Sequence, residues 1–309
     1  PALLVVVFAT CICGYHFLYA SDLRSLLESG QASILMFANI HFWMSQNYFS
    51  DSSILQPLLH TWSLSLEEQF YLLAPIVFLV ILRRFSQVVV IIFILCSGIS
   101  ICLYSYGSFN DKSYAFYLIF TRAWGFLFGG ITFLLEKRFR GSERVWTTIS
   151  FILIFLLTCA WMIAEHYKFT QDYTFTLNIL VSLLEALFIF SRVGLNLPSV
   201  TPVLFIGKIS YSMYLVHFPI ASYYFYQVGV SDAPVPFYLF CLCMALSCFL
   251  YFCVEKPFRY VKISKHIFLV VIFILVLLVF CISQFGKIEY NLVEIWTRYT
   301  INISQIMGH

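Results

Sequence analysis

Apolar runs long enough to cross a lipid bilayer follow one another along almost the whole chain. A membrane-spanning helix needs about 20 predominantly apolar residues. Runs of this length occupy nine stretches of the sequence, at 2–20, 60–82, 87–106, 115–135, 145–164, 174–191, 203–226, 237–254 and 266–285. Only 11% of the residues are charged, whereas soluble domains carry roughly a quarter. The sequence therefore predicts an all-α polytopic membrane protein with about nine transmembrane helices, and it excludes a single soluble core.

The distribution of basic residues predicts how these helices are oriented. Lys and Arg gather in alternate loops, at 83–84, 137–144, Arg192 and 256–265. Because loops rich in Lys and Arg stay in the cytoplasm, Pro1 is expected inside and the tail 286–309 outside. The small net charge of +3 gives no reason to expect a nucleic-acid partner.

The long stretch between the first two spans contains one short apolar segment, 32–42. Its length suits an interfacial or re-entrant helix better than a full crossing. Asn39, Trp43 and Tyr48 lie in this segment or just after it. An aromatic belt at the membrane surface explains these rings, and stacking on a sugar ring is the alternative.

All ten cysteines lie inside apolar runs, where a thiol behaves as a small hydrophobic group. The pair Cys241 and Cys243 has no second pair or histidine cluster that would complete a metal site. Neither a disulfide framework nor a bound metal is expected.

Polar side chains that could take part in chemistry are concentrated at the start of the second span, in 57–75. At the helical period of 3.6 residues, four of them follow one another on one face: His60, Ser63, Glu67 and Tyr71. A charge within a membrane helix costs a few kcal/mol or more, so such groups turn toward water or the interior of a bundle. They could mark only the wet end of a span, or they could line a reaction site.

Several chemical roles fit this stretch. His60 could serve as a general base, with Glu67 or the adjacent Glu68 as an acid or as its partner. A Ser63 nucleophile in a Ser–His–acid triad is the weaker alternative, because side chains stacked along one helix do not converge on a common point.

Arg122 lies in the middle of the fourth apolar run. An arginine there needs an anion, which could be a carboxylate such as Glu67 or Glu68 or the phosphate of a ligand. Structural pairing and ligand contact fit the sequence equally well. Gly125 and Gly129, just beyond it, have the spacing that lets a neighbouring helix approach closely.

Another polar motif lies in 207–219. Ser210, Tyr214 and His217 share one helical face, and Pro219 is expected to break or kink the helix. A lone buried histidine is more often a hydrogen-bonded part of the scaffold than a catalyst.

Two more acidic residues stand out. Glu185 is a charge within an apolar run, where ionisable groups tend to be functional. Glu255 lies in the turn 254–259, which ends a span. The charges of this turn are either a solvated cytoplasmic edge or contacts to an anionic ligand.

Together, these motifs resemble the acyltransferase 3 family of bacterial membrane O-acyltransferases. The resemblance rests on four pieces in the same order, which begin at Asn39, Pro57, Gly207 and Val254. The second piece, Pro-Leu-Leu-His-Thr-Trp-Ser-Leu-Ser-Leu-Glu-Glu-Gln-Phe-Tyr, is long and specific. The resemblance covers nearly the whole chain.

The resemblance implies transfer of an acyl group to a hydroxyl of an extracytoplasmic glycan, such as the O-antigen of lipopolysaccharide, peptidoglycan or another surface polysaccharide. The donor would be acyl-CoA, usually cytoplasmic acetyl-CoA, with no bound cofactor, and the acceptor a surface polysaccharide or lipid-linked glycan. It also implies a multi-pass protein of the bacterial cytoplasmic (inner) membrane. At matching positions it implies catalysis by Glu67, Glu68, His60, Ser63 and Arg122, and substrate binding by Trp43, Tyr48, Trp62, Tyr71, Ser210, His217 and Glu255.

Two parts of the family pattern are not found in this sequence. These are a histidine of the first family helix and an Arg-x-x-Arg element ahead of a proline that resembles Pro1. We therefore expect residues 1–285 to be an N-terminally incomplete acyltransferase domain, part of a ten- or eleven-helix bundle. The ninth span and the tail 286–309 resemble family members whose last helix leads to an extracytoplasmic SGNH-like domain.

The resemblance leads to one mechanistic hypothesis. Acyl-CoA docks from the basic cytoplasmic side, and a histidine of the first family helix, partnered by a carboxylate such as Glu67, activates the acceptor hydroxyl or relays the acyl group. An arginine such as Arg122 offsets the negative charge. Two alternatives remain: a transporter or flippase for lipid-linked glycan, whose polar residues would line a path, and an inactive truncated remnant.

Overall fold

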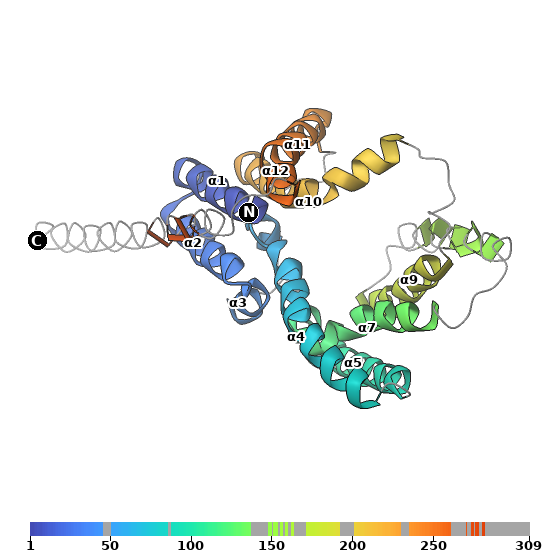
Figure 1. Ribbon diagram of the computed structural model, residues 1–309. Coiled ribbons are helices and arrows are strands. Elements are labelled where there is room, and N and C mark those ends of the chain that lie inside the picture. The colour runs from blue at the N-terminus through green and yellow to red at the C-terminus, as the bar shows by residue number, and fades with distance from the viewer. Residues whose placement is uncertain are drawn as a thin grey trace, which may run out of the picture. The chain divides into compact units, whose positions relative to one another are not determined.

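The computed structural model describes residues 1–45, 51–85, 88–136, 171–191, 201–229 and 235–260, and isolated residues between 148 and 163 and between 270 and 281. Regular structure throughout these residues is helical, without a strand (Figure 1), which confirms the all-α prediction. The chain divides into two compact units. The first unit comprises Pro1–Ser65 and Pro202–His309, and the second comprises Leu66–Thr201.

Three helical segments of the described chain are long and apolar enough to cross a membrane. They are Val89–Asn110, Lys112–Leu135 and Phe237–Arg259. These segments coincide with expected spans, at 87–106, 115–135 and 237–254. The composition and length of this part of the chain therefore support a membrane protein.

The other expected spans are helical over all or most of their length, or are not described. Helices cover 174–191 and 203–226 and most of 2–20 and 60–82, but the apolar helix Ala2–Phe17 is shorter than a full crossing. The expected spans 145–164 and 266–285 lie largely outside the described residues.

The first unit is built from helices of the N-terminal and C-terminal parts of the chain. They are α1 (Ala2–Phe17), α2 (Ala20–Ile34), α3 (Ala38–Ser45), the 3₁₀ turn η1 (Asp51–Leu55), α10 (Thr201–Val228), α11 (Phe237–Leu250), η3 (Tyr251–Glu255) and α12 (Lys256–Tyr260). The first residues of α4 (Thr61–Phe85) also belong to this unit.

The expected single helix over the apolar segment 32–42 is wrong, because the end of α2 and the start of α3 divide it. Met36 adopts a left-handed conformation, with φ of 59°. The Phe37 amide donates a hydrogen bond to the Ala32 carbonyl at 2.8 Å. A turn of this type satisfies the last carbonyls of a helix, so the chain leaves α2 here and begins α3.

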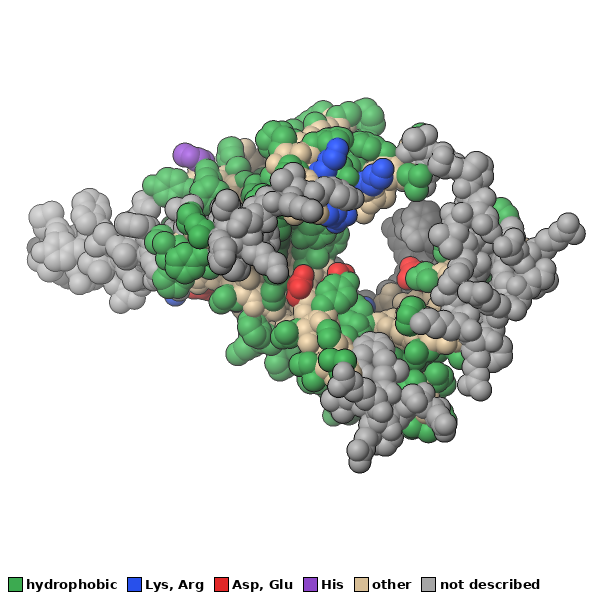
Figure 2. Space-filling model, viewed as in Figure 1, with side chains coloured by type: hydrophobic (Ala, Val, Ile, Leu, Met, Phe, Trp, Pro, Cys, Tyr) green, Lys and Arg blue, Asp and Glu red, His purple; other side chains and the backbone are tan. Residues whose placement is uncertain are grey.

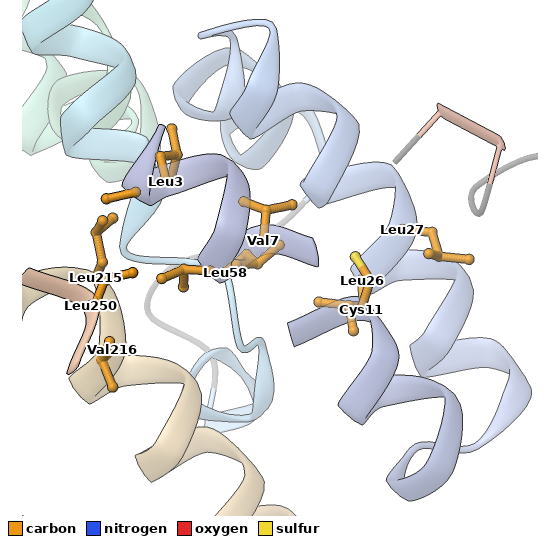
Figure 3. Close-up of a cluster of buried hydrophobic side chains, with 11 residues drawn as sticks. Leu3, Val7, Cys11, Leu26, Leu27, Leu58, Leu215, Val216 and Leu250 are labelled. Atoms are coloured by element: carbon orange, nitrogen blue, oxygen red, sulfur yellow. The ribbon is translucent and has the colours of Figure 1, made fainter. Parts of the chain in front are cut away.

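A core of buried apolar side chains joins α1 and α2 to residues of α10 and α11 (Figure 3). Its buried members are Ala2, Leu3, Val6, Val7, Cys11, Leu26, Leu27, Leu58, Leu215, Val216 and Leu250. Two glycines allow α1 and α2 to pack closely. A Cβ at Gly30 would lie 3.3 Å from Val7 Cγ1, and one at Gly14 would collide with Leu26. Small residues at helix interfaces permit such packing where lipid offers no hydrophobic driving force.

Hydrogen bonds between helices hold the start of α4 and the second half of α10 in place. Ser33 Oγ and Thr61 Oγ1 are 2.7 Å apart, and the Ala38 amide donates to Ser65 Oγ at 3.1 Å. The hydroxyl of Tyr223 donates to a carbonyl of α1 at 2.6 Å. These bonds position the residues that flank the start of α4.

A π-helical turn, η3, separates α11 from α12. Pro257 lies just after this turn. Proline has no amide hydrogen, and its ring crowds the carbonyl four residues earlier, which belongs to Cys253. A local widening of the helix accommodates that conflict, and π turns of this kind often occur at functional sites. The turn ends on Glu255.

The second unit consists of most of α4, together with α5 (Val89–Asn110), α6 (Lys112–Tyr117), α7 (Ile119–Glu136) and α9 (Gln171–Ser191). α7 packs against both α5 and α9. Ser100 of α5 ties α7 in place, because its hydroxyl donates to the Phe120 carbonyl at 2.7 Å and accepts from the Trp124 amide at 3.1 Å.

The expected close helix approach at Gly125 and Gly129 is wrong for the described residues. At both positions, no atom lies within 4 Å of the place that a Cβ would take. The close approach in this unit is at Gly107, where a Cβ would lie 2.8 Å from Tyr114 and 3.0 Å from the side chain of Ala115. The short helix α6, directly after α5, therefore folds against the end of α5.

Candidate active site

His60 lies in the turn that leads into α4 and is only 5% exposed. Its neighbours Leu58 and Leu59 are buried as well. The hydroxyl of Thr61 donates to the Leu58 carbonyl at 2.7 Å, which closes the turn. The local sequence therefore buries a polar ring at the start of a helix.

α10 supplies the side chains that surround His60. The hydroxyl of Tyr214 donates to the His60 carbonyl at 2.6 Å and lies 2.5 Å from Ser63 Oγ. The Phe218 ring stacks on the imidazole of His60, with centroids 5.3 Å apart. The two imidazole rings, of His60 and His217, have centroids 5.7 Å apart. We call His60, Ser63, Tyr214 and His217 the histidine cluster.

The hydrogen bonds of His217 define which of its nitrogens is free for chemistry. Nδ1 lies 2.7 Å from the Tyr214 carbonyl and 3.2 Å from the Met213 carbonyl. A carbonyl accepts but does not donate, so Nδ1 carries the hydrogen and Nε2 of the neutral ring is an acceptor. The side chain of His217 is exposed. It can therefore accept a hydrogen bond from a ligand hydroxyl.

The expected helix break at Pro219 is wrong, because α10 continues through this residue to Val228. Because proline has no amide hydrogen, the carbonyl of Leu215 loses its helical partner. Backbone groups of Leu215 and Pro57 lie near the His60 ring. Neither ring nitrogen of His60 makes a hydrogen bond of good geometry within the described chain.

An unsatisfied polar group costs roughly 1–3 kcal/mol when it is buried. The His60 ring therefore has hydrogen-bonding capacity that the described residues leave unused. Next to it, the exposed side chain of His217 offers Nε2 as a hydrogen-bond acceptor. The Tyr214 hydroxyl is hydrogen-bonded to Ser63 Oγ. This arrangement suits the binding of a hydroxyl compound and the acceptance of its proton.

Glu255 forms a second polar group in the first unit. Its carboxylate accepts a hydrogen bond from the Ser212 hydroxyl at 2.7 Å and lies 2.9 Å from Arg259 Nη2. Glu255 is buried, at 7% exposed, whereas Ser210 is exposed and donates to the Gly207 carbonyl of its own helix at 2.9 Å. The structure thus joins Glu255 to Ser212 and not to Ser210.

The remaining predicted catalytic residues belong to the second unit. Glu67 is half-buried, and Glu68 and Tyr71 are exposed on α4. The Nε of Arg122 donates to the Phe116 carbonyl at 3.3 Å, and its guanidinium lies over the rings of Phe116 and Tyr104, at 4.8 and 5.4 Å. These contacts orient the guanidinium.

The predicted aromatic contacts are only partly described. Trp43 lies exposed on α3 and Trp62 is half-buried at the start of α4, whereas Tyr48 lies outside the described residues.

His41 lies on α3 near Trp43. Burial lowers the pKa of the His41 imidazole below its usual range, and the carboxylate of Glu28 opposes this shift.

Sequence reasoning missed two members of these sites and one contact. Tyr214 was placed on the right face of its helix, but its bond to the His60 backbone was not foreseen. Ser212 and Phe218 were not singled out at all. The adjacent serines in Ser210-Tyr211-Ser212 could have drawn attention to Ser212, but helical periodicity favours Ser210 beside His217.

The chain can also be compared with known proteins. The chain matches the acyltransferase 3 model, described as an acyltransferase domain, over residues 2–254. It is similar to the O-acetyltransferase OatA of Staphylococcus aureus strains NCTC 8325 / PS 47 and COL, with 27% identity over 286 residues, 82% of this chain and 45% of each relative. No solved structure matches it significantly.

The chain spans less than half the length of these curated relatives. The family model, in contrast, covers most of the chain. By this match, the chain belongs to the acyltransferase 3 family.

Proposed function

We propose that this chain is the membrane domain of an O-acyltransferase. The enzyme transfers an acyl group, acetyl in the simplest case, from acyl-CoA on the cytoplasmic side to a hydroxyl of a cell-surface glycan. Membership of the acyltransferase 3 family supports acyl transfer, and the O-acetyltransferase name of its relatives supports acetyl transfer to oxygen. O-antigen and peptidoglycan are the acceptor classes that we expect.

The histidine cluster is the single observation that carries this proposal. It places an exposed imidazole acceptor, His217, beside a buried imidazole with unused hydrogen-bonding capacity, His60. An acceptor hydroxyl that donates to His217 Nε2 is held in the orientation that proton transfer requires. We therefore assign the binding and activation of the acceptor hydroxyl to this cluster.

The chemical step balances with these groups. As the hydroxyl oxygen attacks the thioester carbonyl of the acyl-CoA, its proton passes to His217 Nε2. The tetrahedral oxyanion then collapses, the C–S bond breaks, and the imidazolium returns the proton to the departing thiolate sulfur of CoA. The products are an ester and free CoA, and the histidine ends neutral.

We assign supporting roles to groups of the second unit. The guanidinium of Arg122 is oriented by its aromatic contacts and offers a positive charge to a phosphate of the donor. Glu67 and Glu68 act as an acid or as partners of a catalytic histidine. The aromatic and polar residues Trp43, Tyr48, Trp62, Tyr71, Ser210 and Glu255 keep their predicted role in substrate binding.

The same proposal includes the topology. The chain crosses the bacterial cytoplasmic membrane about nine times, with Pro1 inside and the tail 286–309 outside. Three candidate spans and the alternation of basic loops support this arrangement. Cysteine accessibility on each side of sealed vesicles checks the orientation.

Transfer of labelled acetyl tests the function. Membrane vesicles that contain the protein are supplied with acetyl-CoA labelled in the acetyl group, and base-labile label is measured in the glycan fraction. Incorporation that depends on the protein supports an acyltransferase. Glycan that crosses the membrane without label would instead support a transporter and overturn the proposal.

A matched pair of variants tests the role of Glu67 in the same assay. We expect Glu67→Gln to lower label incorporation at least tenfold, because the amide keeps the shape but loses the charge and the ability to take a proton. Glu28→Gln is the control, since it removes an exposed carboxylate that is ion-paired with Arg24 and such pairs contribute little. Unchanged acetylation in Glu67→Gln would remove Glu67 from the mechanism.

A further inference from the structure

A concavity lies in the first unit, away from the histidine cluster. A pocket of about 380 Å³ opens between the first half of α10 and the junction of α11 with α12. Five side chains line it: Phe205, Lys208, Tyr251, Phe252 and Lys256. Figure 2 shows Lys and Arg side chains gathered over the surface of α10 and α12. The proposed acyl transfer assigns no role to this pocket.

The charge of the pocket is positive and unbalanced. Glu255, the neighbouring carboxylate, is already engaged by Arg259 at 2.9 Å and by the Ser212 hydroxyl at 2.7 Å. Among the residues that the structure describes, neither Lys208 nor Lys256 has an acidic partner. Lys256 Nζ lies 5.5 Å from the centre of the Phe252 ring. Two ammonium groups in one concavity favour an anion.

The helical register separates this pocket from the histidine cluster. Lys208 and His217 are nine residues apart in α10. At 100° per residue they lie on opposite faces, and at 1.5 Å per residue about 14 Å apart along the axis. A ligand held by Lys208 therefore does not face His217, which argues against the acyl donor as the occupant.

Apolar surface adjoins the charged end of the pocket. The rings of Phe205 and Phe252 are stacked, with centroids 6.4 Å apart, and are 37% and 49% exposed. Further exposed apolar side chains, among them Phe249, Leu242 and Tyr238, follow Phe252 on one side of α11. The lysines thus lie at the end of an apolar strip that runs along a candidate membrane span, Phe237–Arg259.

We infer that this pocket binds the phosphate headgroup of an anionic phospholipid, with the acyl chains along the exposed face of α11. Basic pockets between membrane helices at the cytoplasmic surface bind such headgroups. Lys256 begins α12 and the basic segment 256–265, on the side that the positive-inside rule assigns to the cytoplasm. The inference is independent of the proposed acyl transfer.

Thermal unfolding of the full chain in detergent tests the lipid site. Phosphatidylglycerol is titrated into wild type and into Lys208→Gln/Lys256→Gln, and the apparent Kd is read from the shift in Tm. We expect the double variant to bind at least tenfold more weakly. Phosphatidylcholine, which has no net charge, should shift neither protein.

Matched variants separate charge from folding. Lys112→Gln/Lys168→Gln removes the same charge from the loops expected outside, and its Kd should stay within twofold of wild type. Lys208→Arg/Lys256→Arg keeps the charge and should also bind. If the double glutamine variant does not fold, each single variant should still bind at least threefold more weakly.

Soluble ligands distinguish the source of the phosphate. Coenzyme A and inorganic phosphate are titrated in the same way. Lysine-dependent binding of either one, without a response to phosphatidylglycerol, would overturn the lipid assignment in favour of a soluble phosphate. Equal phosphatidylglycerol binding by wild type and the double variant would overturn the site itself.

Discussion

The polar groups of the histidine cluster come from distant parts of the chain, whereas Tyr104 and Phe116, which contact Arg122, lie on α5 and α6, the helices that directly precede its own. Tyr214 bonds to the His60 carbonyl across 154 positions and to Ser63 across 151. Arg122 donates to a carbonyl only six positions away, on Phe116. The first arrangement exists only when the whole unit has folded, and the second can form almost as soon as α6 and α7 do.

This difference separates a site from its scaffold. Polar groups brought together over long distances must each offset the cost of leaving water, so the contacts between them are specific to the native fold. Local contacts such as that of Arg122 to Phe116 orient one side chain and depend little on the rest of the unit. We expect variants in the two regions to differ accordingly.

The largest expected effect on stability is at Ser212. Ser212→Ala leaves the buried carboxylate of Glu255 without its hydroxyl donor, which should lower the free energy of unfolding by about 2 kcal/mol. Thermal unfolding in detergent measures it. Ser108→Ala is the matched control, because its hydroxyl donates only within its own helix, to Tyr104. If the two variants lost the same free energy of unfolding, the long-range and local hydrogen bonds would not differ as we expect.

Tyr214→Phe should cost about 1 kcal/mol, because the His60 carbonyl and Ser63 Oγ both lose the phenol hydroxyl. Acetyl transfer should fall about tenfold, since one lost hydrogen bond corresponds to that factor in rate. Tyr224→Phe on the same helix is the control, because the Tyr224 hydroxyl makes no hydrogen bond within the described residues. A Tyr214→Phe protein with wild-type transfer would show that the cluster does not depend on this bond.

The smallest expected effect on stability is at Arg122. Arg122→Lys keeps the charge but loses the planar group that lies over Phe116 and Tyr104, which should cost roughly 0.5–1 kcal/mol. Acetyl transfer should fall less than in a variant of the histidine cluster. A loss of stability larger than that of Ser212→Ala would place the more specific contacts in the second unit.

Much of the fold was predictable because long apolar runs in a sequence predict membrane helices. The candidate spans Val89–Asn110 and Phe237–Arg259 follow from hydropathy alone. The turn at Met36 and the π turn before Pro257 were not predicted. Both depend on backbone hydrogen bonds, and an apolar run does not reveal them.

The candidate site was predictable in its parts but not in its assembly. Periodicity placed Tyr214 and His217 on one face and His60 with Ser63 on another. It could not show that these two faces meet, because that depends on packing between chain ends. It also selected Ser210 over Ser212, since the partner of Ser212 is a carboxylate on a different helix.

The most direct test of the histidine cluster is acetyl transfer by a His217→Gln variant. Glutamine keeps a polar side chain but cannot take a proton at neutral pH, so label incorporation into the glycan should fall at least 100-fold. His16→Gln, an exposed histidine of α1, should transfer as wild type does. A His217→Gln protein that acetylates the glycan at the wild-type rate would contradict the assignment of the acceptor hydroxyl to this cluster.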